Sequence, residues 1–363
     1  MPTSNSHKNE YFKRQTTLKE IGETGQKQLQ NAKIAIVGCG GLGSIASVYL
    51  AASGIGQLKL IDFDTVNVSN LHRQTYFKLD DINKPKASVL ASYIQKITPF
   101  TKVIPKISAI NKQNVTSVLK DYSVILDCTD NLSVKYLLND YCVLHDKTLI
   151  YGSLYKYDGY VATFNFSLNG RRTTNLRDAF PKIPKKHIPN CSETGTLNTI
   201  VGIIGLLQAN EVLKIITQTG KPLTNQILIY NSLENTQFKM KVHPKFSKKD
   251  IEAIFLNEEY KNIDCDFQLD ELLITKSQLE SLVNDKDIEI ISVIEDKNTY
   301  LPFKKVTKIP LTELKQNSIK LNSQKKYIVI CNKGISSYEA TLFLKKLYPN
   351  ISILSLKNGI SDL

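Results

Sequence analysis

Residues 33–76 constrain the fold of this chain more than any other stretch. They read KIAIVGCGGLGSIASVYLAASGIGQLKLIDFDTVNVSNLHRQTY. An apolar segment runs into closely spaced glycines, a small-residue helical stretch follows, and a second apolar segment ends at Asp62. This order predicts a strand, a tight turn, a helix and a second, parallel strand. Glycine lets the backbone approach a phosphate closely, and the N–H groups of a helix N-terminus attract its charge. The pattern therefore predicts a nucleotide site.

The residues after the glycines favour ATP over NAD. A helix N-terminus largely satisfies the pyrophosphate of NAD, whereas a triphosphate usually needs Arg or Lys donors and a magnesium ligand. Arg73 and Lys86 supply such donors, and Asp130, which follows the apolar segment 124–126, supplies a metal ligand. Alone, each is typical of a solvated charge or a helix cap, but together and in this order they predict ATP. The candidate nucleotide-binding residues are Gly38, Gly40, Gly41, Gly43, Asp62, Asp64, Asn70, Arg73, Gln74, Lys86, Asp130 and Asn131.

The order of apolar and helical segments predicts an α/β fold. Expected strands at 33–37, 57–62, 101–107, 123–127 and 148–151 alternate with expected helices at 43–53, 84–97 and 112–121. This alternation predicts a doubly wound, mostly parallel Rossmann-like sheet. Residues 157–170 then alternate like antiparallel strands with a turn at Asn169–Gly170, 175–190 form a loop, and 226–242 form a hairpin. The stretch 196–217 predicts a strongly apolar helix that belongs to the core or to a dimer interface.

Composition limits the classes of protein. The chain has 363 residues, enough for two domains, with 42% hydrophobic and 22% charged residues. No uninterrupted run approaches the roughly 18 apolar residues of a membrane span, and the N-terminus lacks an apolar segment. The six cysteines of the chain lack paired spacing. These features predict a soluble cytoplasmic protein without a membrane segment. The net charge of +13 comes from dispersed lysines without an aromatic–basic motif, so we expect no specific nucleic-acid binding.

The run GCGGLGS…DFDTVNVSNLHRQTYF…KPKA…LDCTDN resembles the MoeB/ThiF/HesA family, relatives of the ubiquitin-activating enzymes. YFKRQ before this run and GIIGLLQANEVLKII after it extend the resemblance from about residue 11 to about residue 243. The resemblance is specific because several separated motifs agree in order and spacing. It implies an adenylating domain over 8–245 that uses ATP and Mg²⁺. Its substrate would be the C-terminal Gly-Gly carboxylate of a small ubiquitin-fold protein.

The resemblance also implies roles for single residues. The glycines line the phosphate loop, Asp62 holds the ribose, and Asp130 binds magnesium. Arg14, in YFKRQ, matches an arginine that reaches across from a partner subunit, which implies a homodimer. The catalytic residues implied are Arg14, Arg73, Lys86, Asp130, Cys191 and Cys331. No general base is expected, because the attacking carboxylate is already ionised and catalysis consists of positioning and charge neutralisation.

The sequence departs from the family at its zinc site. Most members carry two Cys-x-x-Cys pairs, and here Arg172 and Asn175 stand at the first pair and Phe246 and Lys249 at the second. Zinc needs thiolate or imidazole ligands, so we predict no structural zinc.

Cys191 lies immediately before the apolar helix, and a helix N-terminus favours a thiolate. An ordinary loop cysteine and a nucleophile in sulfur transfer both remain open for this residue.

Residues 246–268 are charged and weakly periodic and predict a linker, and 269–363 resemble a small α/β rhodanese-like domain. Its expected loop, C-x-x-G-x-R-S, reads CNKGISS at 331–337, which places Cys331 at the sulfur-carrying position and Ser336 at the arginine position. The missing arginine leaves two alternatives, a weak sulfurtransferase and a docking domain.

The fusion implies that a ubiquitin-fold carrier is adenylated and then converted to a thiocarboxylate, with sulfur from a donor such as a cysteine desulfurase. A MoaD-like carrier for molybdopterin is favoured because the resemblance over 30–240 is to MoeB. A ThiS-like carrier for thiamine and a carrier for tRNA thiolation are the alternatives. Two other classes also remain, an NAD-dependent oxidoreductase and a non-catalytic binding module.

Overall fold

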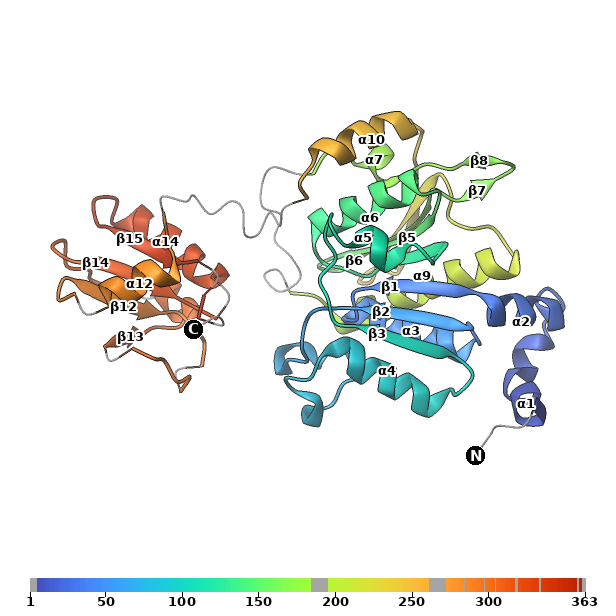
Figure 1. Ribbon diagram of the computed structural model, residues 1–363, viewed down its shortest axis with the longest axis horizontal. Coiled ribbons are helices and arrows are strands. Elements are labelled where there is room, and N and C mark those ends of the chain that lie inside the picture. Colours follow the sequence, from blue (N-terminus) through green and yellow to red (C-terminus); the bar gives the residue numbers. More distant parts are fainter. Residues whose placement is uncertain are drawn as a thin grey trace. The chain divides into compact units, whose positions relative to one another are not determined.

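The computed structural model describes residues 5–183, 195–260 and 272–360, except 284, 297, 304, 317, 318, 333 and 358. The chain forms two compact units, Met1–Tyr260 and Lys261–Leu363 (Figure 1). The segment that we expected to link two domains contains helix α10 (Lys248–Asn257), which packs against helix α6 (Leu132–Leu144) of the first unit.

An eight-stranded sheet forms the centre of the first unit, in the order β10-β9-β6-β5-β4-β1-β2-β3. Strands β3, β2, β1, β4 and β5 are parallel, whereas β6, β9 and β10 add to the β5 edge in antiparallel fashion. This arrangement confirms the predicted doubly wound sheet with its antiparallel extension. The strands are β1 (Lys33–Val37), β2 (Gln57–Ile61), β3 (Lys102–Lys106), β4 (Val124–Asp127), β5 (Thr148–Tyr155), β6 (Asp158–Phe164), β9 (Gln226–Asn231) and β10 (Thr236–Lys241).

Strand β1 shows why helices cover both faces. Its side chains alternate in direction, so Ile34 and Ile36 pack into one apolar core while Ala35 and Val37 pack into the other. The first core is closed by α3 (Gly41–Ala52), α4 (Lys86–Ile97) and α9 (Asn198–Thr217), and the second by α5 (Val115–Leu119) and α6 (Figure 1). Helices α1 (Asn5–Thr16) and α2 (Gly22–Asn31) precede β1.

The topology places the expected site. Strand order reverses between β1 and β4, and ligands of such sheets bind at the carboxyl ends of the strands that flank this point. The glycines follow β1, Asp62 follows β2, and Asp130 follows β4. Residues 90 positions apart in sequence thereby meet at one edge, since Val37 pairs with Asp127.

Two local elements differ from the expected pattern. Residues 175–190 were expected to be a loop, but Leu176–Ala179 form the short helix α7, because Asn175 and Asp178 make reciprocal capping hydrogen bonds. The turn at Asn169–Gly170 is present, with φ of 50° and 76°, but it joins the separate two-stranded hairpin β7 (Ser167–Leu168) and β8 (Arg171–Arg172).

Helix α9 confirms the predicted apolar helix. Among the described residues it alone is long and apolar enough to cross a membrane by length and composition, with a mean hydropathy of 1.6. It packs against α3, β5 and β6, which is the environment of a core helix.

The second unit is a smaller α/β unit. Its five parallel strands have the order β11-β15-β14-β12-β13. They are β11 (Leu273–Ile274), β12 (Ile288–Ser292), β13 (Val306–Lys308), β14 (Lys326–Ile330) and β15 (Ile353–Leu356). One face packs with α13 (Leu311–Gln316) and α14 (Ile335–Leu347), and the other with α12 (Lys276–Leu282).

Candidate functional site

The turn after β1 meets the turn after β4 at the point where strand order reverses. Gly38 has φ of +93°, and an added Cβ there would lie 2.6 Å from the carbonyl oxygen of Cys128. A Cβ on Gly43 would lie 1.8 Å from the carbonyl oxygen of Gly38. Side chains are therefore excluded at both positions. Residues 38–43, the glycine loop, place the N-terminus of α3 at the carboxyl edge of the sheet.

Asp62 holds the glycine loop to the end of β2. Its carboxylate accepts the Cys39 N–H at 2.6 Å and the Asp64 N–H at 2.8 Å. Burial raises the pKa of Asp62, and the two N–H donors act in the opposite direction. Each carboxylate oxygen has a second lone pair, so the group can also accept hydrogen bonds from the hydroxyls of a ribose.

Lys86 is a buried cation beside Asp62. It is the first residue of α4, its side chain is 6% exposed, and its Nζ lies 2.6 Å from Asp64 Oδ2. The Lys86 N–H also donates to the Asp64 carbonyl, so backbone and side chain together hold the amino group in place. Asp64 thus positions Lys86.

A short segment beside the glycine loop carries Asn70, Arg73 and Gln74. Asn70 Oδ1 accepts a hydrogen bond from Arg73 Nη2 at 2.5 Å. Gln74 is 4% exposed, and its Nε2 would lie 3.2 Å from a Cβ on Gly40. Gln74 Oε1 is buried without a hydrogen-bond partner among the described residues. An unsatisfied buried acceptor against the glycine loop fits a site that a polar ligand completes.

The turn after β4 carries Asp130 and Asn131. Asp130 is exposed, whereas Asn131 is the N-cap of α6 and accepts the Val134 N–H through Oδ1. The structure therefore gives Asn131 a local role in starting the helix.

Arg14 does not join this cluster within one chain. It lies exposed near the end of α1, and the neighbouring Gln15 donates to the Ser53 carbonyl. Ser53 caps the C-terminal end of α3, while the glycine loop lies at its N-terminal end. A helix of this length spans about 18 Å at 1.5 Å per residue, too far for one arginine side chain.

Of the two cysteines proposed for sulfur transfer, one lies in the described part of the chain. Cys191 lies outside the described residues. Cys331 directly follows β14 and is buried, and its Sγ accepts the Gly334 N–H at 3.1 Å and lies 3.2 Å from Ser337 Oγ. Ser355 Oγ donates to the same Ser337 oxygen at 2.9 Å. The sulfur therefore accepts one backbone N–H, and its thiol donates to one hydroxyl oxygen.

The two segments at which most family members carry zinc ligands are joined here by a carboxylate. Asp178, which is 2% exposed, accepts the Asn175 N–H through Oδ2 at 2.8 Å. Its Oδ1 accepts the Lys245 and Phe246 N–H groups at 2.7 and 2.9 Å. The residues at these positions do not fit zinc, and the described part of the chain holds no cluster of three or more possible ligands among His, Cys, Asp and Glu.

A buried ion pair beneath the β4 turn was not found from the sequence. Lys135 Nζ lies 3.1 Å from Asp127 Oδ2, and Asp127 directly precedes the turn that carries Asp130. Asp127 is the first residue of the motif DCTDN, and Lys135 follows the motif on the next helix. Their spacing alone is equally typical of an acidic residue at a strand end and a lysine on a helix surface.

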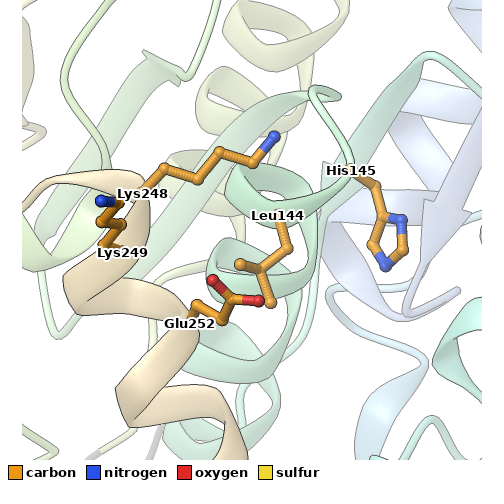
Figure 2. A pocket seen from close by; sticks show the side chains of 5 residues that line it. All are labelled: Leu144, His145, Lys248, Lys249 and Glu252. Carbon is orange, nitrogen blue, oxygen red and sulfur yellow. The ribbon is translucent and has the colours of Figure 1, made fainter.

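A cavity of about 560 Å³ lies between the end of α6 and α10 (Figure 2). It is lined by Leu144, His145, Lys248, Lys249 and Glu252, none of which belongs to the candidate nucleotide set. Burial and the neighbouring lysines lower the pKa of His145, and Lys248 pairs with Asp146 at 2.7 Å. This cavity is separate from the glycine loop.

Known proteins resemble this chain over most of its length. A sulfur carrier protein adenylyltransferase of Thermus thermophilus is 36% identical over 233 residues, which cover 64% of this chain and 86% of that protein. An adenylyltransferase and sulfurtransferase MOCS3 of Drosophila grimshawi is 30% identical over 96% of this chain and 82% of its own length. A probable adenylyltransferase/sulfurtransferase MoeZ of Mycobacterium tuberculosis is 29% identical over 92% of this chain and 88% of that protein.

Solved structures share the fold of the first unit. The E. coli MccB structure with ATP has a TM-score of 0.54 at 25% identity and covers 61% of this chain and 67% of its own. Residues 12–251 match the ThiF family, which is more than half of the chain. The chain therefore belongs to the ThiF family and is an adenylyltransferase.

Proposed function

We propose that this enzyme uses ATP to adenylate the C-terminal Gly-Gly carboxylate of a ubiquitin-fold sulfur carrier. The observation that carries the proposal is the group of candidate residues around the glycine loop. Lys86 and Arg73 supply positive charge, and Gln74 presents a buried acceptor without a partner among the described residues. The name of the Thermus relative and the names of the MOCS3 and MoeZ proteins support this reaction class.

The residue types fit a triphosphate with a divalent cation. Asp62 accepts the ribose hydroxyls, and Arg73 and Lys86 contact the phosphates. Asp130, an exposed carboxylate at the end of β4, suits Mg²⁺, which binds proteins through few carboxylates and keeps water or phosphate as its other ligands. When bound, the cation neutralises phosphate charge.

The reaction needs charge neutralisation more than proton transfer. A carboxylate oxygen of the carrier forms a bond to the α-phosphorus of ATP, and the bond from that phosphorus to the bridging oxygen breaks. Diphosphate leaves with the electron pair. Lys86 and Arg73 lower the repulsion between the two anions and stabilise the leaving group.

A second copy of the chain completes the site in this proposal. Gln15, the neighbour of Arg14, donates to Ser53 at the end of α3 that is far from the glycine loop, which supports a role for Arg14 in the site of a partner subunit. A homodimer places two such arginines reciprocally, as two-fold symmetry requires.

The second unit is proposed to be rhodanese-like and to bring sulfur to the adenylated carrier through Cys331. The relatives named as both adenylyltransferase and sulfurtransferase align with nearly the whole chain, which supports this role. Cys191 remains a candidate nucleophile in the same transfer, and a cysteine desulfurase is the expected type of sulfur donor.

A MoaD-like carrier is the favoured substrate. One relative, 35% identical over 234 residues, is a probable molybdopterin-synthase adenylyltransferase of Gracilaria tenuistipitata, which supports that pathway. A ThiS-like carrier for thiamine and a carrier for tRNA thiolation are the alternative substrates of the same chemistry.

ATP–pyrophosphate exchange tests the proposal. MoaD-like and ThiS-like carriers are added one at a time, each with a matched carrier that lacks the final glycine. Exchange with one intact carrier and none with its truncated form establishes the reaction and identifies the substrate. Mg·ATP binding without exchange for any carrier overturns the carrier proposal.

A further inference from the structure

Two charged side chains lie buried beneath the turn that carries Asp130. The side chains of Lys135, on α6, and Asp127, at the end of β4, are 3% and 0% exposed. Lys135 Nζ lies 3.1 Å from Asp127 Oδ2 and donates to the Gly152 carbonyl at 2.7 Å. Burial lowers the pKa of Lys135, but Asp127, together with Tyr151 and Cys128, raises it by more, so the net direction is upward. Lys135 and Asp127 therefore form a buried ion pair.

The second oxygen of Asp127 holds the turn itself. Asp127 Oδ1 accepts the Thr129 N–H at 3.1 Å and the Thr129 hydroxyl at 2.7 Å. Thr129 directly precedes Asp130. The chain of contacts thus runs from Lys135 through one carboxylate to the residue next to the proposed metal ligand.

The same strand end is also held from the opposite face of the sheet. Gln208, on α9 and fully buried, donates through Nε2 to the Asp127 carbonyl at 2.8 Å and to the Ile150 carbonyl at 3.3 Å. Lys135 and Gln208 therefore immobilise the end of β4 from the two cores, and the turn has a rigid base.

A buried ion pair is weak evidence of a contribution to stability. Removing two charges from water costs several kcal/mol per ion, and well-packed apolar side chains of similar volume often serve stability equally well. Here Asp127 belongs to the same turn as Asp130, and its hydrogen bonds to Thr129 hold the backbone that orients Asp130.

We propose that Lys135, acting through Asp127, is a positioning residue that orients the Thr129–Asp130 turn for the metal-bound phosphates of ATP. The inference rests on the proposed function. It assigns to Lys135 no contact with substrate, since its amino group is occupied by Asp127 and Gly152.

The test replaces the pair by neutral side chains of similar size, with Lys135→Met and Asp127→Asn in one variant. The double variant leaves no unpaired buried charge, and the amide oxygen of the introduced asparagine can still accept from Thr129. Calorimetry on the full chain measures the dissociation constants of Mg·ATP and of AMP, which needs no metal. We expect the constant for Mg·ATP to rise about tenfold, equivalent to about 1.4 kcal/mol, while that for AMP changes less than twofold.

A matched control distinguishes positioning from general loosening. Arg177 and Asp140 form another buried ion pair at 2.6 Å, and Asp140 lies on the same helix α6. Arg177→Met with Asp140→Asn should lower the melting temperature and leave both dissociation constants unchanged. Equal weakening of Mg·ATP by both double variants, or no weakening by the first, overturns the inference. A wild-type chain that binds neither ligand contradicts the proposed function instead.

Discussion

Lys86 is the residue whose surroundings most depend on the fold. The sequence places it on the first turn of a helix, where a solvated lysine is ordinary, and only the structure shows it buried against Asp64. Burial strengthens its interaction with any nearby phosphate, because little water screens the charge. Its contribution to catalysis can therefore be separated from that of exposed lysines close by.

Lys86→Met should lower ATP–pyrophosphate exchange by about 100-fold or more, the range for removing one preorganised charge-stabilising group. Lys84→Met is the matched control, because Lys84 is 57% exposed and forms only a surface pair with Asp81 at 3.4 Å. Exchange and melting temperature are measured for both variants. Equal losses in the two would show that the burial of Lys86 has no catalytic meaning.

Cys331 is a second single residue whose substitution tests the proposed function. Cys331→Ser should abolish sulfur transfer to the carrier and leave adenylation unchanged, because this cysteine lies in the second unit. Cys142→Ser serves as control, since burial raises the pKa of the Cys142 thiol and keeps it unreactive at neutral pH. Thiocarboxylate formation is measured by mass spectrometry of the carrier. Sulfur transfer that survives Cys331→Ser would leave the second unit with docking alone.

Helix α7 was not expected from the sequence, although its capping residues were visible there. Asn175 and Asp178 have the spacing of a capping box, but the prolines and charges after them are typical of a loop. Strand β1, by contrast, has the bounds that its apolar pattern predicts, because a strand buried on both faces has a continuous apolar sequence.

Asp178 links α7 to the segment before α10. Asp178→Ala should reduce the free energy of unfolding by about 3 kcal/mol, since the buried Asn175 N–H and the partly buried N–H groups of Lys245 and Phe246 lose a charged acceptor. Asp250→Ala, which removes the equivalent capping residue of α10 at an exposed position, should reduce the free energy of unfolding less. Denaturant unfolding with and without a chelator measures both effects. A chelator that destabilises the wild-type chain would reveal a bound metal and contradict this account.

The position of Arg14 predicts that two chains of a homodimer contribute to each nucleotide site. Arg14→Ala and Lys86→Met variants should each be inactive alone. After unfolding and refolding as an equal mixture, about a quarter of the wild-type exchange activity should return, because half of the dimers are mixed and each mixed dimer has one intact site. Exchange that stays at the level of the separate variants would indicate that Arg14 acts within its own chain or not at all.

Much of the fold and of the candidate site was predictable from local patterns. These patterns are the glycine spacing, the alternation of apolar segments and the acidic residue after β2. Each lies within a short stretch of sequence, so it can be recognised without the structure. The structure brings Asp62, Asp64 and Lys86 together beside the glycine loop, as the carboxyl ends of parallel strands require.

Local sequence patterns were enough to predict the doubly wound sheet, the glycine loop and the order of the charged residues along the carboxyl edge of the sheet. The packing of the folded chain, by contrast, sets the pairing of Lys135 with Asp127, the support of the same strand end by Gln208, and the link from Asp178 to a residue 67 positions later. These contacts depend on which buried donor meets which buried acceptor after the helices have packed on the sheet. No local pattern encodes that choice, because it is made by side chains brought together from separate elements.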